Sequence, residues 1–262
     1  MKDIIISALY EGTYSVGIDK IFNKIDRDDP PAKGALKLSI NPFLIQDQDH
    51  TILFDVGIGD LLSEESSIDA ILNNLSEHSI TEYDITDIFI SHLHFDHFAG
   101  LANRKNGYWD LTFPDASIWV SEEGWKDLND NLDGKPDDHQ ELIHFLNMRA
   151  DMRFLNDGSN PIPQVRIEKI GGHTEHHLAL FYKNGDHRYV MAGDVLGRRI
   201  AVNKNFLAKF DFDPKQSMEA RNRIKELAYS DGYTIMAYHE TDYPLFKLVG
   251  YKNKDGYTIE NV

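Results

Sequence analysis

The stretch that most strongly constrains the fold and the chemistry of this protein is Ser91-His92-Leu93-His94-Phe95-Asp96-His97-Phe98-Ala99-Gly100. It follows the apolar run Ile88-Phe89-Ile90, which is typical of a buried β-strand. Successive side chains of an extended chain point to opposite faces, so the first two histidines of the stretch lie on one side, and Asp96 and His97 come where the strand ends. Three imidazoles and one carboxylate therefore gather in a short segment.

This segment predicts a metal site. Its ligand-type residues are His92, His94, Asp96 and His97, and imidazole nitrogens and carboxylate oxygens are ligands that zinc and similar divalent ions prefer. A surface loop of ordinary polar residues is the alternative, but the spacing His-x-His-x-Asp-His after a strand strongly favours metal binding. Because distant histidines would add to four ligands already present, two metal ions are expected rather than one.

The motif resembles the metallo-β-lactamase superfamily, and four further segments follow in that family's order. They are Asp55 in Leu53-Phe54-Asp55-Val56-Gly57, His173 in Gly172-His173-Thr174, Asp194 in Gly193-Asp194, and His239 in Ala237-Tyr238-His239. The resemblance covers nearly the whole chain and implies a single domain over residues 1–262. It implies an α/β (α+β) architecture, the four-layer αββα sandwich of the metallo-β-lactamase fold, with metals at one edge.

The resemblance also implies a role for each candidate ligand. His92, His94 and His173 would hold the first metal ion, Asp96, His97 and His239 the second, and Asp194 would bridge both. Two such cations lower the pKa of a bridging water and polarise a carbonyl or phosphoryl oxygen, and Asp96 or Asp194 would accept or shuttle the proton. Asp55 is expected to orient a ligand histidine, with turn capping as the alternative.

The segment around His173 departs from the family pattern. The family commonly shows Gly-His-Thr-Pro-Gly-His, whereas this chain has Glu175 and His176 in place of the proline and glycine. We expect His173 to be the ligand, His177 to support it, and His176 to be exposed.

Composition limits the function classes. The chain has 262 residues, no cysteine and 41% hydrophobic residues, so any metal must be held by His, Asp or Glu. No apolar run approaches the roughly 18–20 residues of a membrane span, and the first residues are not typical of a signal peptide, so a cytoplasmic location is expected. A net charge of −16 argues against nucleic acid and anionic membranes as partners. The basic segment 221–225 is interpreted as a solvated helix face.

Apolar runs and turn residues predict the remaining elements. Asp28-Asp29-Pro30-Pro31 predicts a loop over residues 23–34, and Asp213-Pro214 predicts the start of a helix that ends at Asp231-Gly232. Strands are expected at 2–9, 85–90, 116–120, 165–170 and 233–237, hairpins at 36–54 and 178–192, and further helices at 68–75, 98–103, 122–128 and 139–148.

Within the superfamily, the segments from residue 193 to 239 look most like the branch of quorum-quenching lactonases and methyl parathion hydrolase-type enzymes. This implies a metallo-hydrolase with two divalent ions, Zn²⁺ first and Fe²⁺, Mn²⁺ or Co²⁺ as alternatives. The substrate would be a small molecule, namely a lactone, ester or phosphotriester. Many lactonases place a tyrosine three residues after the bridging aspartate, where this chain has Gly197, so a homoserine lactone is less favoured.

Three alternatives stay open from the sequence. One is a thioester hydrolase like glyoxalase II, another is a phosphodiester hydrolase like the nucleases of the superfamily, and the third is a non-catalytic metal-binding protein. The number of ligands argues against the third, because structural zinc is typically closed by four. A homodimer is implied by the resemblance alone.

Overall fold

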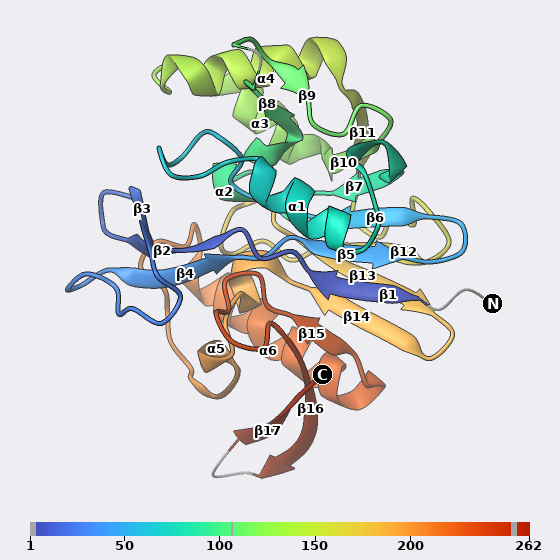
Figure 1. Cartoon of the computed structure of the whole chain (residues 1–262). Helices are drawn as coiled ribbons and strands as arrows, with labels where there is room; N and C mark the ends of the chain where they lie inside the picture. Colours follow the sequence, from blue (N-terminus) through green and yellow to red (C-terminus); the bar gives the residue numbers. More distant parts are fainter. Residues whose placement is uncertain (1–3, 106, 253–255) are drawn as a thin grey trace. The chain divides into compact units, whose positions relative to one another are not determined.

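The structure is a computed structural model that describes residues 4–105, 107–252 and 256–262. It divides into two compact units, residues 1–154 and 155–262. Among the described residues each unit is built on a six-stranded sheet (Figure 1). The single-domain organisation of residues 1–262 stays a prediction.

The sheet of the first unit places its polar loops at one edge. Its strands in spatial order are β1 (Ile5–Ala8), β5 (Phe43–Gln46), β6 (Thr51–Phe54), β7 (Asp87–Phe89), β10 (Ser117–Ser121) and β11 (Asp151–Leu155). β6 and β7 run parallel, with Phe54 opposite Phe89. Parallel strands end at the same edge, so Asp55 and the segment 90–97 leave the sheet side by side.

The remaining elements of the first unit cover this sheet and extend it. A three-stranded sheet has the order β3 (Phe22–Ile25), β2 (Gly12–Val16) and β4 (Leu36–Ile40), and β8 (Ala102–Asn103) pairs with β9 (Asp110–Leu111). The helices are α1 (Asp69–Glu77), α2 (Phe95–Phe98), α3 (Glu122–Asp130) and α4 (Asp137–Arg149). Apolar faces of α1, α3 and α4 share one buried core with the strands. That core fixes β6 and β7 rigidly.

The second unit is also built on a sheet in which several strands end at the same edge. Its sheet has the order β12 (Val165–Lys169), β13 (Leu178–Asn184), β14 (His187–Met191), β15 (Thr234–Met236), β16 (Leu245–Lys252) and β17 (Gly256–Asn261), and its helices are α5 (Ile200–Asn203) and α6 (Pro214–Asp231). β12 and β14 both pair antiparallel with β13, and β15 runs parallel to β14. The three strands β12, β14 and β15 therefore end at one edge, where the chain continues into His173, Asp194 and His239.

Most predicted elements are present. The helix predicted from Asp213 is α6, whose first amides are capped by the Asp213 carboxylate and which ends at Gly232 with φ +72°. The hairpin at 178–192 is β13 and β14, with Asn184 opposite His187, so the turn residues are Gly185 and Asp186. The first strand is β1, and residues 2 and 3 of its predicted range lie outside the described residues.

Three predictions about elements were wrong in part. Residues 36–54 form two strands before the turn, β4 and β5, because Pro42 interrupts the run, and only β5 pairs with β6. Residues 23–25 of the predicted loop belong to the strand β3, which pairs with β2. The helix predicted at 98–103 begins earlier, at Phe95, and passes through a 3₁₀ turn into β8.

No helix in the described part of the chain combines the length and the apolar character needed to cross a membrane.

Candidate metal centre

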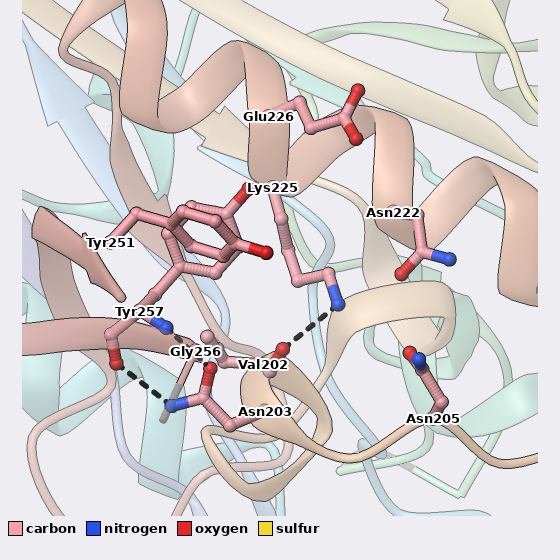
Figure 2. A pocket seen from close by; sticks show the side chains of 9 residues that line it. All are labelled: Val202, Asn203, Asn205, Asn222, Lys225, Glu226, Tyr251, Gly256 and Tyr257. Atoms are coloured by element: carbon pink, nitrogen blue, oxygen red, sulfur yellow. Dashed lines mark hydrogen bonds between the residues drawn. The ribbon is translucent and has the colours of Figure 1, made fainter. Parts of the chain in front are cut away.

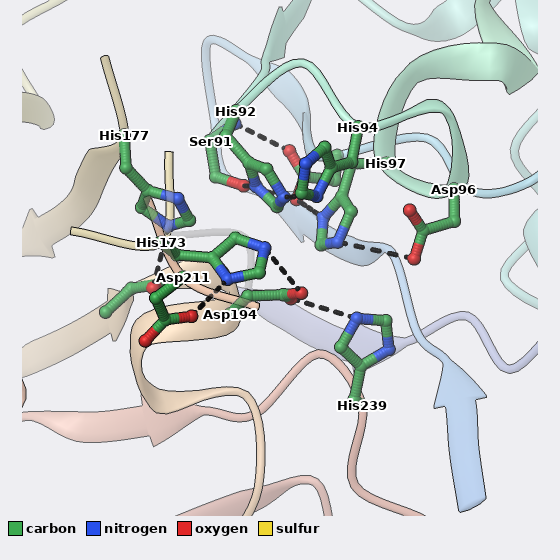
Figure 3. Close-up of polar contacts among 12 residues, drawn as sticks. Ser91, His92, His94, Asp96, His97, His173, His177, Asp194, Asp211 and His239 are labelled. Carbon is green, nitrogen blue, oxygen red and sulfur yellow. Dashed lines mark hydrogen bonds and ion pairs between the residues drawn. The ribbon is translucent and has the colours of Figure 1, made fainter. Parts of the chain in front are cut away.

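The first unit brings together the ligand-type residues of the 91–100 stretch. His92, Asp96 and His97 are buried, and His94 is half-buried. The Nε2 atom of His92 lies 3.1 Å from Nδ1 of His94, and the ring centroids of His92 and His97 are 4.1 Å apart. Asp96 Oδ2 lies 3.6 Å from Nε2 of His97. Figure 3 shows this group of side chains, which is a suitable set of metal ligands.

Asp55 fixes the orientation of His97. Its Oδ2 atom lies 2.6 Å from Nδ1 of His97 and accepts a hydrogen bond from the hydroxyl of Ser91, while Oδ1 accepts one from the Ser91 amide. Burial raises the pKa of the Asp55 carboxyl, and the contacts with His97 and Ser91 oppose that rise. With Nδ1 engaged, Nε2 is the nitrogen of His97 that could bind a metal ion, as in the arrangement common for supported histidine ligands.

In the second unit, a pair of glycines places His173. Gly171 and Gly172 have φ of +61° and +90°, and a Cβ at Gly172 would lie 2.4 Å from the backbone of Ser217 in α6. The segment is tied to the residues before α6, because the amides of Phe212 and Asp213 donate to the carbonyls of His173 and Gly172. The sequence therefore needs glycine here for both backbone conformation and space.

Asp194 lies between two histidines of the same unit. Its Oδ2 atom is 3.1 Å from Nε2 of His173, and its Oδ1 atom is 2.9 Å from Nε2 of His239. The amide of His239 donates to the carbonyl of Gly197, which holds the end of β15 against the 3₁₀ turn that carries Asp194. Each carboxylate oxygen thus faces a different imidazole (Figure 3).

Asp211 contacts His173, and the sequence did not reveal this contact. Its Oδ1 atom lies 2.8 Å from Nδ1 of His173, so His173 is held on one side by Asp211 and faces Asp194 on the other. Burial lowers the pKa of His173, but the two carboxylates outweigh it and raise the pKa to about 9. Asp211 stands between two exposed phenylalanines, and no local pattern marks it as a partner of a residue so distant in the sequence.

The comparisons with known proteins agree with this geometry. The family model of the metallo-β-lactamase superfamily matches residues 36–239. The chain belongs to the metallo-β-lactamase superfamily. Membership confirms the prediction of a metallo-hydrolase with the metallo-β-lactamase fold, with mixed α and β content and several sheets. None of the curated proteins matches the sequence significantly.

Solved structures of the superfamily resemble the whole chain. A protein described as a probable metal-dependent hydrolase from Staphylococcus aureus is 24% identical, with a TM-score of 0.78 over 100% of this chain and 99% of that one. The dizinc quorum-quenching lactonase AidC is 18% identical, with a TM-score of 0.76 over 99% and 95%. The hydrolase AbOPH is 22% identical, with a TM-score of 0.76 over 100% and 95%. At these identities the likeness establishes the fold.

Although residues 175–176 depart from the family pattern, His173 faces Asp194. His177 is fully buried, and its Nε2 donates to the carbonyl of Ala192, just before the Asp194 turn. Its ring meets that of His173 edge to face, with the ring centroids 5.7 Å apart, and its role in supporting a ligand stays a prediction. His176 is half-buried, so its predicted exposure was wrong.

The prediction of a solvated face at residues 221–225 was also wrong, because α6 buries two of its cations. Arg221 and Lys225 donate to the backbone carbonyls of Val195 and Val202, in the short helical segments around and after Asp194. Figure 2 shows Lys225 reaching Val202 inside a polar pocket of about 270 Å³. Burial lowers the pKa of both groups. These cations anchor the segment that carries Asp194 to α6.

Proposed function

We propose that this protein is a binuclear metal-dependent hydrolase. The observation that carries the proposal is Asp194, whose two oxygens lie 3.1 and 2.9 Å from the Nε2 atoms of two different histidines. A carboxylate that bridges two metal ions presents one oxygen to each ion. Asp194 already has that arrangement toward the ligand nitrogens of His173 and His239.

In this proposal the ligand sets follow the order of motifs in the superfamily. One ion would be held by His92, His94 and His173, the other by Asp96, His97 and His239, and Asp194 would contribute to both. The residues suit such ions, because the ligand atoms of His92 and His94 lie within 4.8 Å of each other, as do those of Asp96 and His97 and those of His173 and Asp194. With nitrogen and oxygen ligands and no cysteine, zinc is the expected metal.

The bound ions would polarise the substrate oxygen and lower the pKa of a bound water. The protein supplies the positions and the proton acceptor. Asp55 and Asp211 each hold the Nδ1 side of a ligand histidine, so that Nε2 stays available. In this proposal, Asp96 or Asp194 would accept the proton.

The proposed substrate is a lactone, ester or phosphotriester with an apolar group. Four apolar side chains stand 41–65% exposed in one segment that also contains Asp211, namely Phe206, Leu207, Phe210 and Phe212. In the first unit, the aromatic side chains of Tyr14 and Trp125 are buried, so they offer no exposed apolar surface to a substrate. A Cβ at Gly197 would lie 3.4 Å from Cδ2 of His239 and 3.2 Å from the carbonyl of Gly193. That position has little room for the tyrosine of many homoserine lactonases, which favours other esters and lactones.

The test combines metal content with turnover. Elemental analysis of the purified protein should give close to two zinc ions per chain, and a panel of lactones, aryl esters and phosphotriesters should reveal hydrolysis. Asp194→Asn should lower kcat/KM by about 10²–10⁴-fold while the protein stays folded, and Asp186→Asn, in the exposed turn between β13 and β14, is the matched control. Turnover confined to thioesters or phosphodiesters would favour the rival hydrolases. A folded, metal-loaded protein without any turnover would refute the proposal.

A further inference from the structure

Glu11 is a buried carboxyl outside the proposed ligand sets. It directly precedes β2, is 6% exposed, and its amide donates to the carbonyl of Ile40 at the end of β4. Its Oε2 atom accepts a hydrogen bond of 3.0 Å from the amide of Ile58. Its Oε1 atom is buried and has no hydrogen-bond partner among the residues that the structure describes. Burying a polar atom without a hydrogen-bond partner costs free energy. The contact that this carboxyl does make therefore calls for a structural or functional reason.

The contact lies on the turn that follows β6, residues 55–59. A Cβ placed on Gly57 would lie 2.1 Å from both carboxyl oxygens of Glu11, so this carboxyl lies directly across the turn. Asp55 and Gly57 have φ of +56° and +78°. An aspartate in the left-handed region costs on the order of 1 kcal/mol or more, so the surroundings must hold the turn in this conformation.

The opposite side of the same turn contacts the metal-ligand segment. The amide of Val56 donates to the carbonyl of His97, and the amide of Gly100 donates to the carbonyl of Gly57. The Asp55 side chain then holds Ser91 and His97. The turn is thus held between the Glu11 carboxyl on one side and the segment 97–100 on the other.

We propose that Glu11 is a positioning residue for the metal centre, which holds the turn 55–59 so that Asp55 keeps His97 in its ligand orientation. Gly57 is glycine in part because the carboxyl occupies the space of a side chain. Burial raises the pKa of Glu11 to about 8, so at neutral pH the side chain is mostly an uncharged acceptor for the Ile58 amide. This inference rests on the proposed function for the role of His97 as a ligand.

The first test uses Glu11→Gln, Glu11→Ala and Glu11→Asp, with Thr13→Val as the matched control. Glutamine keeps an oxygen for the Ile58 amide, whereas alanine removes it and aspartate is one methylene too short. Thr13 is a fully buried polar residue on β2, the strand that Glu11 directly precedes, and its hydroxyl is hydrogen-bonded to Ser39 and Tyr10, away from the turn. Zinc affinity would be measured by competition with a chromophoric chelator. Loss of a partner behind a metal ligand typically costs 10–100-fold in affinity.

We expect that fall for Glu11→Ala and Glu11→Asp, and a change below about threefold for Glu11→Gln and Thr13→Val. If alanine at position 11 prevents folding, the aspartate variant decides. Unchanged zinc affinity in the alanine or aspartate variants would overturn the inference, and so would a glutamine variant as impaired as alanine.

The second test does not depend on metal or activity. The proton on Nδ1 of His97, hydrogen-bonded to Asp55, should give a downfield NMR resonance in the metal-free protein, assigned by its loss in His97→Gln. It should broaden or shift in Glu11→Ala and Glu11→Asp but persist in Glu11→Gln and Thr13→Val. A resonance unaffected in all four variants would overturn the positioning role. A wild-type protein that binds no metal would instead refute the proposed function, and this resonance would still decide the role of Glu11.

Discussion

The Glu11→Gln variant should make the protein more stable at pH 8 but not at pH 5. Glu11 has a pKa of about 8 when folded, against 4.5 for an exposed glutamate, mainly because it is buried, with the nearby Asp60 carboxylate adding to the rise. The folded state therefore holds this proton more tightly than the unfolded state. The contribution of Glu11 to the stability of the wild type must fall as the pH rises from about 4.5 and level off above about 8, whereas glutamine has no proton to lose.

The magnitude follows from the two pKa values. Between them, each pH unit costs the wild type about 1.4 kcal/mol relative to a side chain that does not titrate. From pH 5 to pH 8 the advantage of Glu11→Gln should grow by about 3–4 kcal/mol, an upper limit if water reaches the ionised group. At pH 5 the free energies of unfolding of the wild type and Glu11→Gln should be nearly equal. Glutamine and protonated glutamate both offer an oxygen to the amide of Ile58. In both, the other polar group, at the Oε1 position, has no partner among the described residues.

Urea unfolding of the metal-free proteins, followed by circular dichroism at pH 5, 6, 7 and 8, measures this difference. Every other titratable group is common to both proteins, so the difference between the curves isolates Glu11. Thr13→Val should show an offset from the wild type that does not change with pH. A constant difference between Glu11→Gln and the wild type across the range would refute the reasoning, because it would mean that Glu11 ionises as an exposed glutamate does.

Three further predictions concern the second unit and the metals. Asp211→Asn should weaken zinc binding by about 10–100-fold in the same chelator competition, because His173 loses the carboxylate at its Nδ1; equal affinity would show that Asp211 is dispensable. Gly172→Ala should lower the unfolding free energy by about 2 kcal/mol or more, since φ is +90° and the new methyl would lie 2.4 Å from Ser217. Gly185→Ala is the control, because Gly185 also has a positive φ but open space around it. In urea unfolding, Gly185→Ala should lower the unfolding free energy by less than Gly172→Ala does. Removing metal with a chelator should abolish hydrolysis, and adding back zinc or manganese should restore it; turnover that survives full metal removal would contradict a metal-dependent reaction.

Local features of the sequence predicted much of the fold. The Asp213-Pro214 start and Gly232 end of α6 are encoded within a few residues, because capping depends on the side chain next to the helix. The same holds for the hairpin of β13 and β14. Where pairing with a neighbouring strand determines the secondary structure, the prediction from the sequence was wrong. Residues 23–25 are an example, because they form an edge strand only through their pairing with β2.

The candidate ligands were also readable in the sequence, since histidines and aspartates at strand ends form a recognisable pattern. The supporting contacts were not. Asp211 meets His173 across 38 residues of sequence, and Glu11 meets Ile58 across 47. Nothing near either residue in the chain distinguishes it from an ordinary surface carboxylate.

The sequence by itself thus determined which residues can bind metal and which family the chain resembles, because both depend on residue type and order. Only the tertiary structure decided that Arg221 and Lys225 are buried and that Glu11 lies across Gly57. The physical reason is that burial and pKa depend on what surrounds a side chain in space. A buried carbonyl of Val195 or a buried amide of Ile58 becomes an available partner only once the chain has folded.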